Sequence, residues 1–92
     1  MENLFLSLQK PSDVRSKIGE LVKAMRTSRN MTQQELAEKL NLTRLTIHKI
    51  ENGKNFNIDT LLLILQYFDL LNVFSEFIEE QRVQFKDFGS FY

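Results

Sequence analysis

Apolar residues recur at intervals of three and four along most of the chain, which is the spacing of a buried helix face. The first such stripe lies between Pro11 and Ser28 and consists of Val14, Ile18, Leu21, Val22 and Met25. Ser12 or Asp13 is able to cap the free amide groups at its start. The pattern predicts a first helix that ends near Ser28 and packs its stripe against a core.

A second, shorter pattern begins at Thr32. Glu35 stands three residues later and completes a capping box, in which each residue satisfies a backbone amide of the other. The apolar positions of this segment are Leu36, Ala37 and Leu40. We expect a helix of about nine residues that ends at Asn41, because Asn tolerates the left-handed backbone conformation of a sharp helix exit.

A third pattern starts almost immediately, so that only Asn41 and Leu42 form the turn. Thr43 is its expected cap, and Gly53 is its expected end. Its narrow inner face consists of Ile47 and Ile50. The side chains left outside are Arg44, Leu45, Thr46, His48 and Lys49. The tight connection predicts two helices held at a fixed angle.

Two further helices are expected in the second half of the chain. Asn57 is able to cap the fourth, whose buried candidates are Ile58, Leu61, Leu62, Ile64, Leu65 and Phe68. A break near Asp69 precedes the fifth, from about Leu71 to Gln84, which places Glu76, Glu79 and Glu80 outside an apolar stripe. This stripe consists of Leu71, Phe74, Phe77 and Ile78. The tail after it keeps the apolar residues Val83, Phe85, Phe88, Phe91 and Tyr92.

These elements predict an all-α fold, a compact bundle of five helices. We expect an N-terminal arm at 1–11, a helical domain at 12–70 with its two close helices at about 32–52, and a C-terminal helix with an aromatic tail at 71–92. The alternating segment LFLSL is able to form a short strand or an arm between subunits. A chain of 92 residues has room for one core only.

Charge is distributed unevenly although the formal net charge is zero. Ten Lys and Arg side chains and five Asp and Glu side chains lie between Lys10 and Lys54. From Asn55 to Tyr92 the chain has two basic and six acidic residues. This asymmetry is typical of a nucleic-acid-binding face joined to a partner-binding half, although uneven scatter of charge in a short chain is the alternative.

Several classes of protein are disfavoured by what the sequence lacks. There is no cysteine, which excludes disulfides and thiolate metal sites and suits a reducing cytoplasm. The longest apolar run, Leu61 to Leu65, is far too short to span a bilayer, and Met1 to Leu8 is a poor signal peptide. A lone His48 without a Gly-rich phosphate loop leaves no catalytic cluster. We expect a cytoplasmic protein that is not an enzyme and needs no cofactor, metal or membrane.

The segment MTQQELAEKLNLTRLTIHKIENGK resembles the helix-turn-helix of the phage-repressor and Cro type, also called the XRE family. Its usual pattern is T-Q-x-x-L-A, a turn with Gly or Asn, Ser or Thr at the start of the recognition helix, and then I-x-x-I-E-x-G. All of these positions are matched, and the resemblance covers about Val14 to Leu70. It implies a second helix that enters the major groove of double-stranded DNA, which is wide enough to admit one helix.

The resemblance also implies roles for individual residues. The positions that face base edges are Arg44, Leu45, Thr46 and Lys49, with His48 beside them. The positions that contact phosphates are Thr32, Gln33, Thr43, Asn52 and Lys54. Independently, Arg or Lys suits the guanine acceptors and Leu suits a thymine methyl group. The alternative is that Arg44, His48 and Lys49 form a merely solvated helix face.

Arg26 and Glu51 match an Arg and a Glu that the family commonly pairs. A guanidinium held by a carboxylate would fix the third helix against the first, so we expect a structural ion pair. The chain departs from the family at two places. Arg29 and Asn30 stand where an apolar residue and Gly are usual, and Asp69 stands where Gly is usual.

A single helix-turn-helix makes few base contacts, so we expect a homodimer on half-sites about one DNA turn apart. Its interface candidates are Leu71, Phe74, Phe77 and Ile78, although this stripe and the tail are also able to complete the core of a monomer. Two functions fit. The first is a transcriptional regulator, a repressor on a palindromic operator. The alternative is the antitoxin of a toxin-antitoxin pair, which binds a toxin protein and represses its own operon.

Overall fold

The computed structural model describes residues 9–89, with side chains as far as Lys86. In this range five helices follow one another without a strand: α2 (Pro11–Ser28), α3 (Gln33–Lys39), α4 (Arg44–Glu51), α5 (Ile58–Tyr67) and α6 (Leu71–Gly89). The expected all-α fold is therefore confirmed for these residues. The segment LFLSL, the side chain of Phe88, and Phe91 and Tyr92 lie outside the described residues. None of the described helices is long and apolar enough to cross a membrane.

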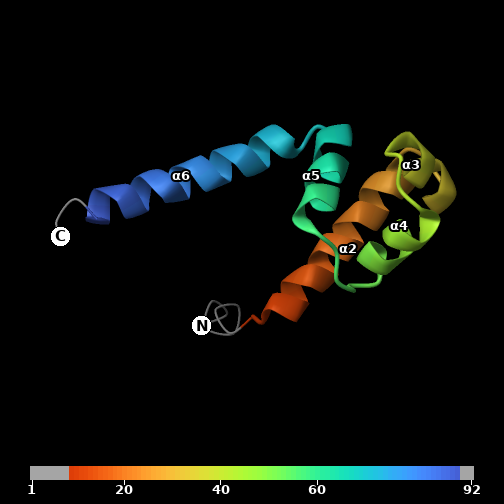
Figure 1. The fold of residues 1–92 in the computed structure, drawn as a ribbon, viewed down its shortest axis with the longest axis horizontal. Helices are drawn as coiled ribbons and strands as arrows, with labels where there is room; N and C mark the ends of the chain where they lie inside the picture. Colours follow the sequence, from red (N-terminus) through yellow and green to blue (C-terminus); the bar gives the residue numbers. More distant parts are fainter. Residues whose placement is uncertain (1–8, 90–92) are drawn as a thin grey trace.

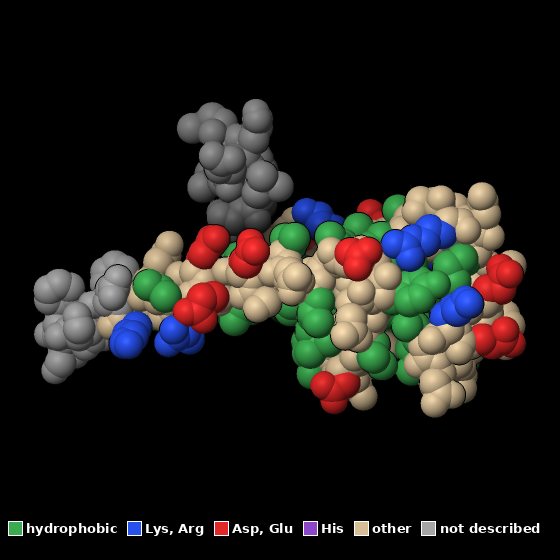
Figure 2. All heavy atoms as spheres, turned by 90° about the horizontal axis from the view of Figure 1, so that it is seen from above, with side chains coloured by type: hydrophobic (Ala, Val, Ile, Leu, Met, Phe, Trp, Pro, Cys, Tyr) green, Lys and Arg blue, Asp and Glu red, His purple; other side chains and the backbone are tan. Residues whose placement is uncertain are grey.

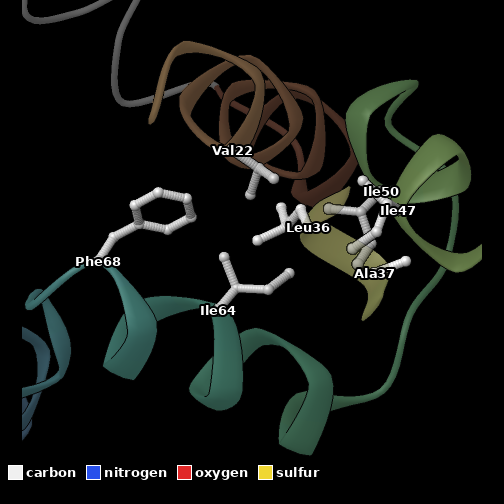
Figure 3. Close-up of a cluster of buried hydrophobic side chains, with 7 residues drawn as sticks. All are labelled: Val22, Leu36, Ala37, Ile47, Ile50, Ile64 and Phe68. Carbon is white, nitrogen blue, oxygen red and sulfur yellow. The ribbon is translucent and has the colours of Figure 1, made fainter. Parts of the chain in front are cut away.

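One apolar core joins the first four of these helices (Figure 3). Val22 of α2 and Ile64 of α5 point toward the α3 and α4 side chains between them. The cluster consists of Val22, Leu36, Ala37, Ile47, Ile50, Ile64 and Phe68. Each buried aliphatic or aromatic side chain of this size contributes roughly 1.5–3 kcal/mol to folding. Since α3 and α4 each place two residues in this core, the angle between them is fixed by packing.

The apolar stripe of α2 is only partly used. Val22 is fully buried and Ile18 and Met25 pack against the core, whereas Val14 and Leu21 are each 43% exposed. The expectation of five buried residues was therefore wrong for Val14 and Leu21. The reason is length, because α2 has 18 residues and its neighbours α3 and α4 have 7 and 8. Short helices cover only part of a long stripe.

Helix starts follow the expected caps with one exception. The hydroxyl of Thr32 accepts from the Glu35 amide at 3.0 Å, while the Glu35 carboxylate accepts from the Thr32 amide at 2.8 Å. The side chains of Thr43 and Asn57 accept from the Thr46 and Thr60 amides and so cap α4 and α5. At α2 the helix begins at Pro11, as expected, and the Asp13 carboxylate accepts from the Lys10 backbone amide at 2.9 Å. Ser12 is already inside the helix, so it is not the cap.

Helices α2, α3, α4 and α5 all end in the same way. Each is followed by a residue with positive φ, namely Asn30, Asn41, Gly53 and Asp69. The next amide then reaches back to a carbonyl five residues earlier, as from Leu42 to Ala37 at 2.8 Å and from Leu70 to Leu65 at 2.8 Å. This is the Schellman arrangement, which satisfies the last free carbonyls of a helix. Asn30 and Asp69 thus adopt the left-handed conformation at positions where the family usually has glycine.

Helix α6 departs from the compact bundle. It begins at Leu71 as expected but continues to Gly89, beyond the expected end at Gln84. Figure 1 shows it extending away from the other helices, which gives the chain principal extents of 50 × 28 × 22 Å. Compactness therefore holds for α2 to α5 only. Ile58 at the start of α5, expected to be buried, is 58% exposed.

Candidate nucleic-acid interface

A short connection joins α3 and α4, which pack against each other. Helix α3 ends at Lys39, two residues before the expected Asn41, and the four residues 40–43 make the connection. Asn41 has a φ of 56°, and its amide donates to the Glu38 carbonyl at 3.3 Å. Leu42 is partly buried against the core. The turn is therefore anchored at both its backbone and its apolar side chain.

Helix α4 divides into a buried face and an exposed face. Ile47 and Ile50 are fully buried, and they alone supply its side of the core. The exposed side chains are Arg44, Leu45, His48 and Lys49. Leu45, which follows Arg44 in the sequence, is 57% exposed. The combination offers hydrogen-bond donors beside an apolar surface.

Thr46 differs from this group because it is only partly exposed. Its hydroxyl lies 2.9 Å from the Thr43 hydroxyl, which also accepts from the Thr46 amide at 3.2 Å. Both threonines are thus engaged in capping α4. Any contact that they make with another molecule has to share or replace this pairing.

Two other residues assigned to phosphate binding also have side-chain partners within the chain. The Gln33 amide donates to the Glu51 carboxylate at 3.0 Å. The Asn52 amide donates to the His48 carbonyl at 2.8 Å and so closes the last turn of α4. These bonds give Gln33 and Asn52 a structural role that sequence reasoning did not include.

A broad open hollow of about 860 Å³ lies beside the exposed face of α4. Its lining includes Leu45, His48 and Lys49 from α4 and Lys54 from the loop that follows. Arg15 of α2 completes it, and the Arg15 Nε donates to the Gly53 carbonyl at 3.2 Å. Three cationic side chains therefore surround one concave surface. Sequence reasoning missed Arg15, although Gly19 one turn later marks the place where α2 approaches another backbone.

Arg26 and Glu51 form the expected ion pair, and it is bidentate. The two nitrogen to oxygen distances are 2.7 and 2.9 Å, and the side chains are 11% and 3% exposed. The remaining Arg26 nitrogen donates to the Met31 carbonyl at 2.7 Å. One guanidinium thus joins α2, the loop before α3 and the end of α4. With Gln33 on the same carboxylate, this network fixes α4 relative to both neighbouring helices.

The network changes the protonation behaviour of its members. Burial raises the pKa of the Glu51 carboxyl, but hydrogen bonds from Arg26 and Gln33 and the charges of Arg26 and Lys23 outweigh it, so the pKa lies below its ordinary value. The hydrogen bond to Glu51 raises the pKa of Arg26. Folding therefore favours the ionised carboxylate.

This shift predicts a specific acid dependence. A lowered folded-state pKa adds stability that is fully present above the unfolded value of about 4.3 and is lost as pH falls through the folded value. We expect Glu51→Gln to be less stable than the wild type at neutral pH, and the difference in unfolding free energy to shrink below about pH 4. Urea denaturation of both proteins across this range measures it. A difference that stays constant from neutral to acid pH would contradict the prediction.

Helix α4 follows a tight turn, is held in place by the core and by Arg26, and exposes cations beside Leu45. This arrangement is that of the helix-turn-helix class of DNA-binding domain. Residues 22–71, more than half of the chain, match the helix-turn-helix family, and the chain belongs to this family. Its type is that of the XRE regulators, as the motif implied.

A relative whose name states its function supports the same class of protein. Over 52 residues the chain is 38% identical to the HTH-type transcriptional activator BcrR of Enterococcus faecalis. The match covers 55% of this chain and 26% of the relative. The chain thus spans about a quarter of the length of that protein. DNA binding and transcription regulation are therefore the functional class of this domain.

Proposed function

We propose that the chain is a sequence-specific transcriptional regulator whose α4 reads bases in the major groove. The observation that carries the proposal is the exposed face of α4, where Arg44 and Lys49 stand beside Leu45 while the opposite face is locked in the core. Arg and Lys donate to the N7 and O6 acceptors of guanine, and Leu covers a thymine methyl group. His48 and Thr46 stay secondary candidates for base contacts.

Phosphate contacts are assigned around the hollow beside α4. Lys54 and Arg15 both lie on its lining near the end of α4, where the Arg15 Nε donates to the Gly53 carbonyl. Cations beside a recognition helix contact phosphates, and so orient a protein on DNA without selecting its sequence. Thr32, Gln33, Thr43 and Asn52 stay predictions for the same task. The bonds of Gln33 and Asn52 within the chain favour an indirect contribution from these two, through the position of α4.

We further infer that two copies act together on a palindromic operator. A two-fold symmetric dimer places two recognition helices on half-sites about one DNA turn, roughly 34 Å, apart. Leu71, Phe74, Phe77 and Ile78 of α6 are the proposed interface. Repression, by occlusion of the operator, is the proposed outcome. The name of the relative from Enterococcus faecalis denotes an activator. Expression from a promoter-reporter fusion, measured with and without the chain, distinguishes activation from repression.

DNA binding is tested by selecting bound sites from random DNA and measuring affinity for the selected site. We expect Arg44→Ala and Lys49→Ala each to cost about 1–3 kcal/mol of binding free energy, roughly tenfold to hundredfold in affinity. They should also relax selection at one base position each. Binding by the wild type should weaken steeply as salt rises, because phosphate contacts release counterions.

Two further variants each remove one positive charge, and together they distinguish a phosphate contact from a general effect of charge on DNA affinity. Arg15→Ala should weaken binding similarly on all sequences and reduce the salt slope by about 1, as expected for a phosphate contact. Lys86→Ala removes the same charge from α6, away from the hollow, and should leave affinity for a half-site unchanged. If the double variant Arg44→Ala with Lys49→Ala bound the selected site like the wild type, the proposed reading surface would be wrong.

A further inference from the structure

The direction of α6 is set at its first turn. Leu71 and Phe74 are half-buried, whereas every described side chain of α6 after Phe74 is exposed, apart from the half-buried Gln81. Figure 2 shows this helix from above as a narrow arm with acidic and basic side chains along it. A helix of 19 residues is about 28 Å long, so a rotation of about 10° at its base moves its far end by about 5 Å. Small differences at the α5–α6 junction therefore decide where the arm points.

This junction is a short turn anchored in the core. The connection consists of three residues, because α5 ends at Tyr67 and α6 begins at Leu71. Phe68 is 8% exposed and belongs to the core cluster. Asp69 has a φ of 63°, and the amide after it donates back to a carbonyl of α5 at 2.8 Å. These contacts fix the turn with respect to α5.

Arg29, from the distant loop between α2 and α3, lies over the same junction. Its guanidinium carbon is 4.7 Å from the centre of the Phe68 ring and 5.4 Å from that of the Tyr67 ring. The two rings meet edge to face with their centres 5.1 Å apart, so one cation contacts an aromatic pair, which is an attractive arrangement. An Arg29 nitrogen is also 4.0 Å from the Asp69 carboxylate, but the Asp69 side chain is 91% exposed, so this ion pair adds little. The aromatic contact is therefore the main link between Arg29 and the junction.

The loop that carries Arg29 is in turn held to the end of α4. The Arg29 amide donates to the Arg26 carbonyl at 3.2 Å, and the Arg26 side chain holds Glu51. The Tyr67 hydroxyl donates to the Met31 sulfur at 4.0 Å, and the Met31 carbonyl accepts from Arg26 at 2.7 Å. This loop thus contacts the α5–α6 junction on one side and, on the other, the residue that fixes the recognition helix.

We propose that Arg29 is a positioning residue, which holds α6 in one direction relative to α4 and thereby sets the half-site spacing that the chain accepts. The first part concerns a single copy and needs no partner. The second part rests on the proposed dimer, in which α6 joins two copies. The direction of α6 then fixes the distance between the two recognition helices, and linked modules gain affinity only where both sites are reached together.

The direction of α6 is tested by the distance between two spin labels in one chain. The chain has no native cysteine, so labels are placed on Glu38→Cys of α3 and Lys86→Cys of α6, both at exposed positions. A large excess of unlabelled chain keeps distances between copies out of the signal. We expect one narrow distance distribution, and roughly a twofold broader one when Arg29→Ala is added. A broad distribution without Arg29→Ala, or equal widths with and without it, would overturn the proposal.

Two other substitutions test whether the aromatic contact is the cause. Arg29→Lys keeps a cation but not the planar group that stacks on the rings, so its distribution should be of intermediate width. Arg82→Ala removes an Arg of α6 itself, one that pairs with Glu79, and should leave the width unchanged. The Arg29 side chain is 45% exposed, so Arg29→Ala should stay folded, which circular dichroism verifies. Equal broadening by Arg29→Ala and Arg82→Ala would refute a specific role of Arg29.

Half-site spacing is tested on DNA once selection has given the operator. We expect the wild type to lose roughly tenfold in affinity when two base pairs are inserted between the half-sites, because the insertion moves and rotates one site relative to the other. Arg29→Ala should lose no more than about threefold, since a freer arm still reaches both sites. The two chains should bind a single half-site equally, because Arg29 lies outside the exposed face of α4. Equal losses in both chains on the longer operator would refute the role in spacing.

These outcomes are separate from those for DNA binding. A narrow label distance that Arg29→Ala broadens, in a chain that selects no DNA site, would leave the positioning of α6 by Arg29 standing and refute the proposed function. Selection of a DNA site by a chain whose label distances are already broad would do the opposite.

Discussion

Arg26→Ala is expected to destabilise the chain by about 3–5 kcal/mol, which is the usual cost of leaving one member of a buried ion pair without its partner. Glu51 would keep only the Gln33 amide, and the Met31 carbonyl would lose its donor. A domain of this size has a total stability on the order of 5–15 kcal/mol, so the loss is a large share of it. Urea denaturation at fixed protein concentration measures the change as a lower midpoint.

Two further substitutions isolate the cause. Arg26→Lys keeps the charge but not the planar fork that reaches both Glu51 and Met31, so its stability should fall between those of Arg26→Ala and the wild type. Arg82→Ala removes an equally short pair with Glu79, but one whose side chains are 59% and 58% exposed. It should cost far less than Arg26→Ala, because solvent screens an exposed pair. Equal losses at Arg26 and Arg82 would show that burial is not the reason.

The same substitution should impair DNA binding indirectly. Arg26 does not belong to the exposed face of α4, but it fixes the end of that helix through Glu51. At a temperature where Arg26→Ala is still folded, we expect weaker binding with unchanged base preference. A change in the preferred bases would instead make Arg26 a reading residue.

The helix-turn-helix was predictable because its signals are local. The capping box of Thr32 and Glu35, the left-handed turn at Asn41 and the two inward isoleucines of α4 each depend on residues a few positions apart. The left-handed backbone conformation of Asn30 and Asp69 was harder to predict. Their backbone adopts the conformation that glycine would adopt, because Asn and Asp are the other residues that tolerate it.

What the sequence did not indicate depends on contacts between distant segments. Periodicity places Val14 and Leu21 on the apolar face of α2, yet it does not reveal that the helices opposite are too short to cover them. Likewise, the apolar stripe of α6 does not reveal whether this helix packs against its own bundle or extends away from it, as it does in Figure 1. Arg15 joins the hollow only because α2 crosses the end of α4.

Gly19 marks that crossing and is expected to be the most sensitive small residue of the chain. A Cβ at this position would lie 2.4 Å from the Ile50 carbonyl oxygen and 2.9 Å from the Glu51 carbonyl oxygen. Both atoms belong to the backbone, so neither is able to move without shifting α4. Gly19→Ala should gain about 1 kcal/mol from helix propensity. Overpacking at a buried contact costs about 1–3 kcal/mol, and with two backbone oxygens in conflict we expect the upper end of this range, which leaves a net loss of about 2 kcal/mol.

The control for Gly19→Ala is Glu20→Ala, on the exposed side of the same helix, where stability should change by less than about 0.5 kcal/mol. DNA affinity should also fall in Gly19→Ala, since the clash separates α2 from α4 at the place where Arg15 and Arg26 hold it. Thermal unfolding and affinity for the selected site measure the two effects. If Gly19→Ala were more stable than the wild type and bound DNA equally well, the close approach of α2 to α4 would not be a constraint on the reading helix.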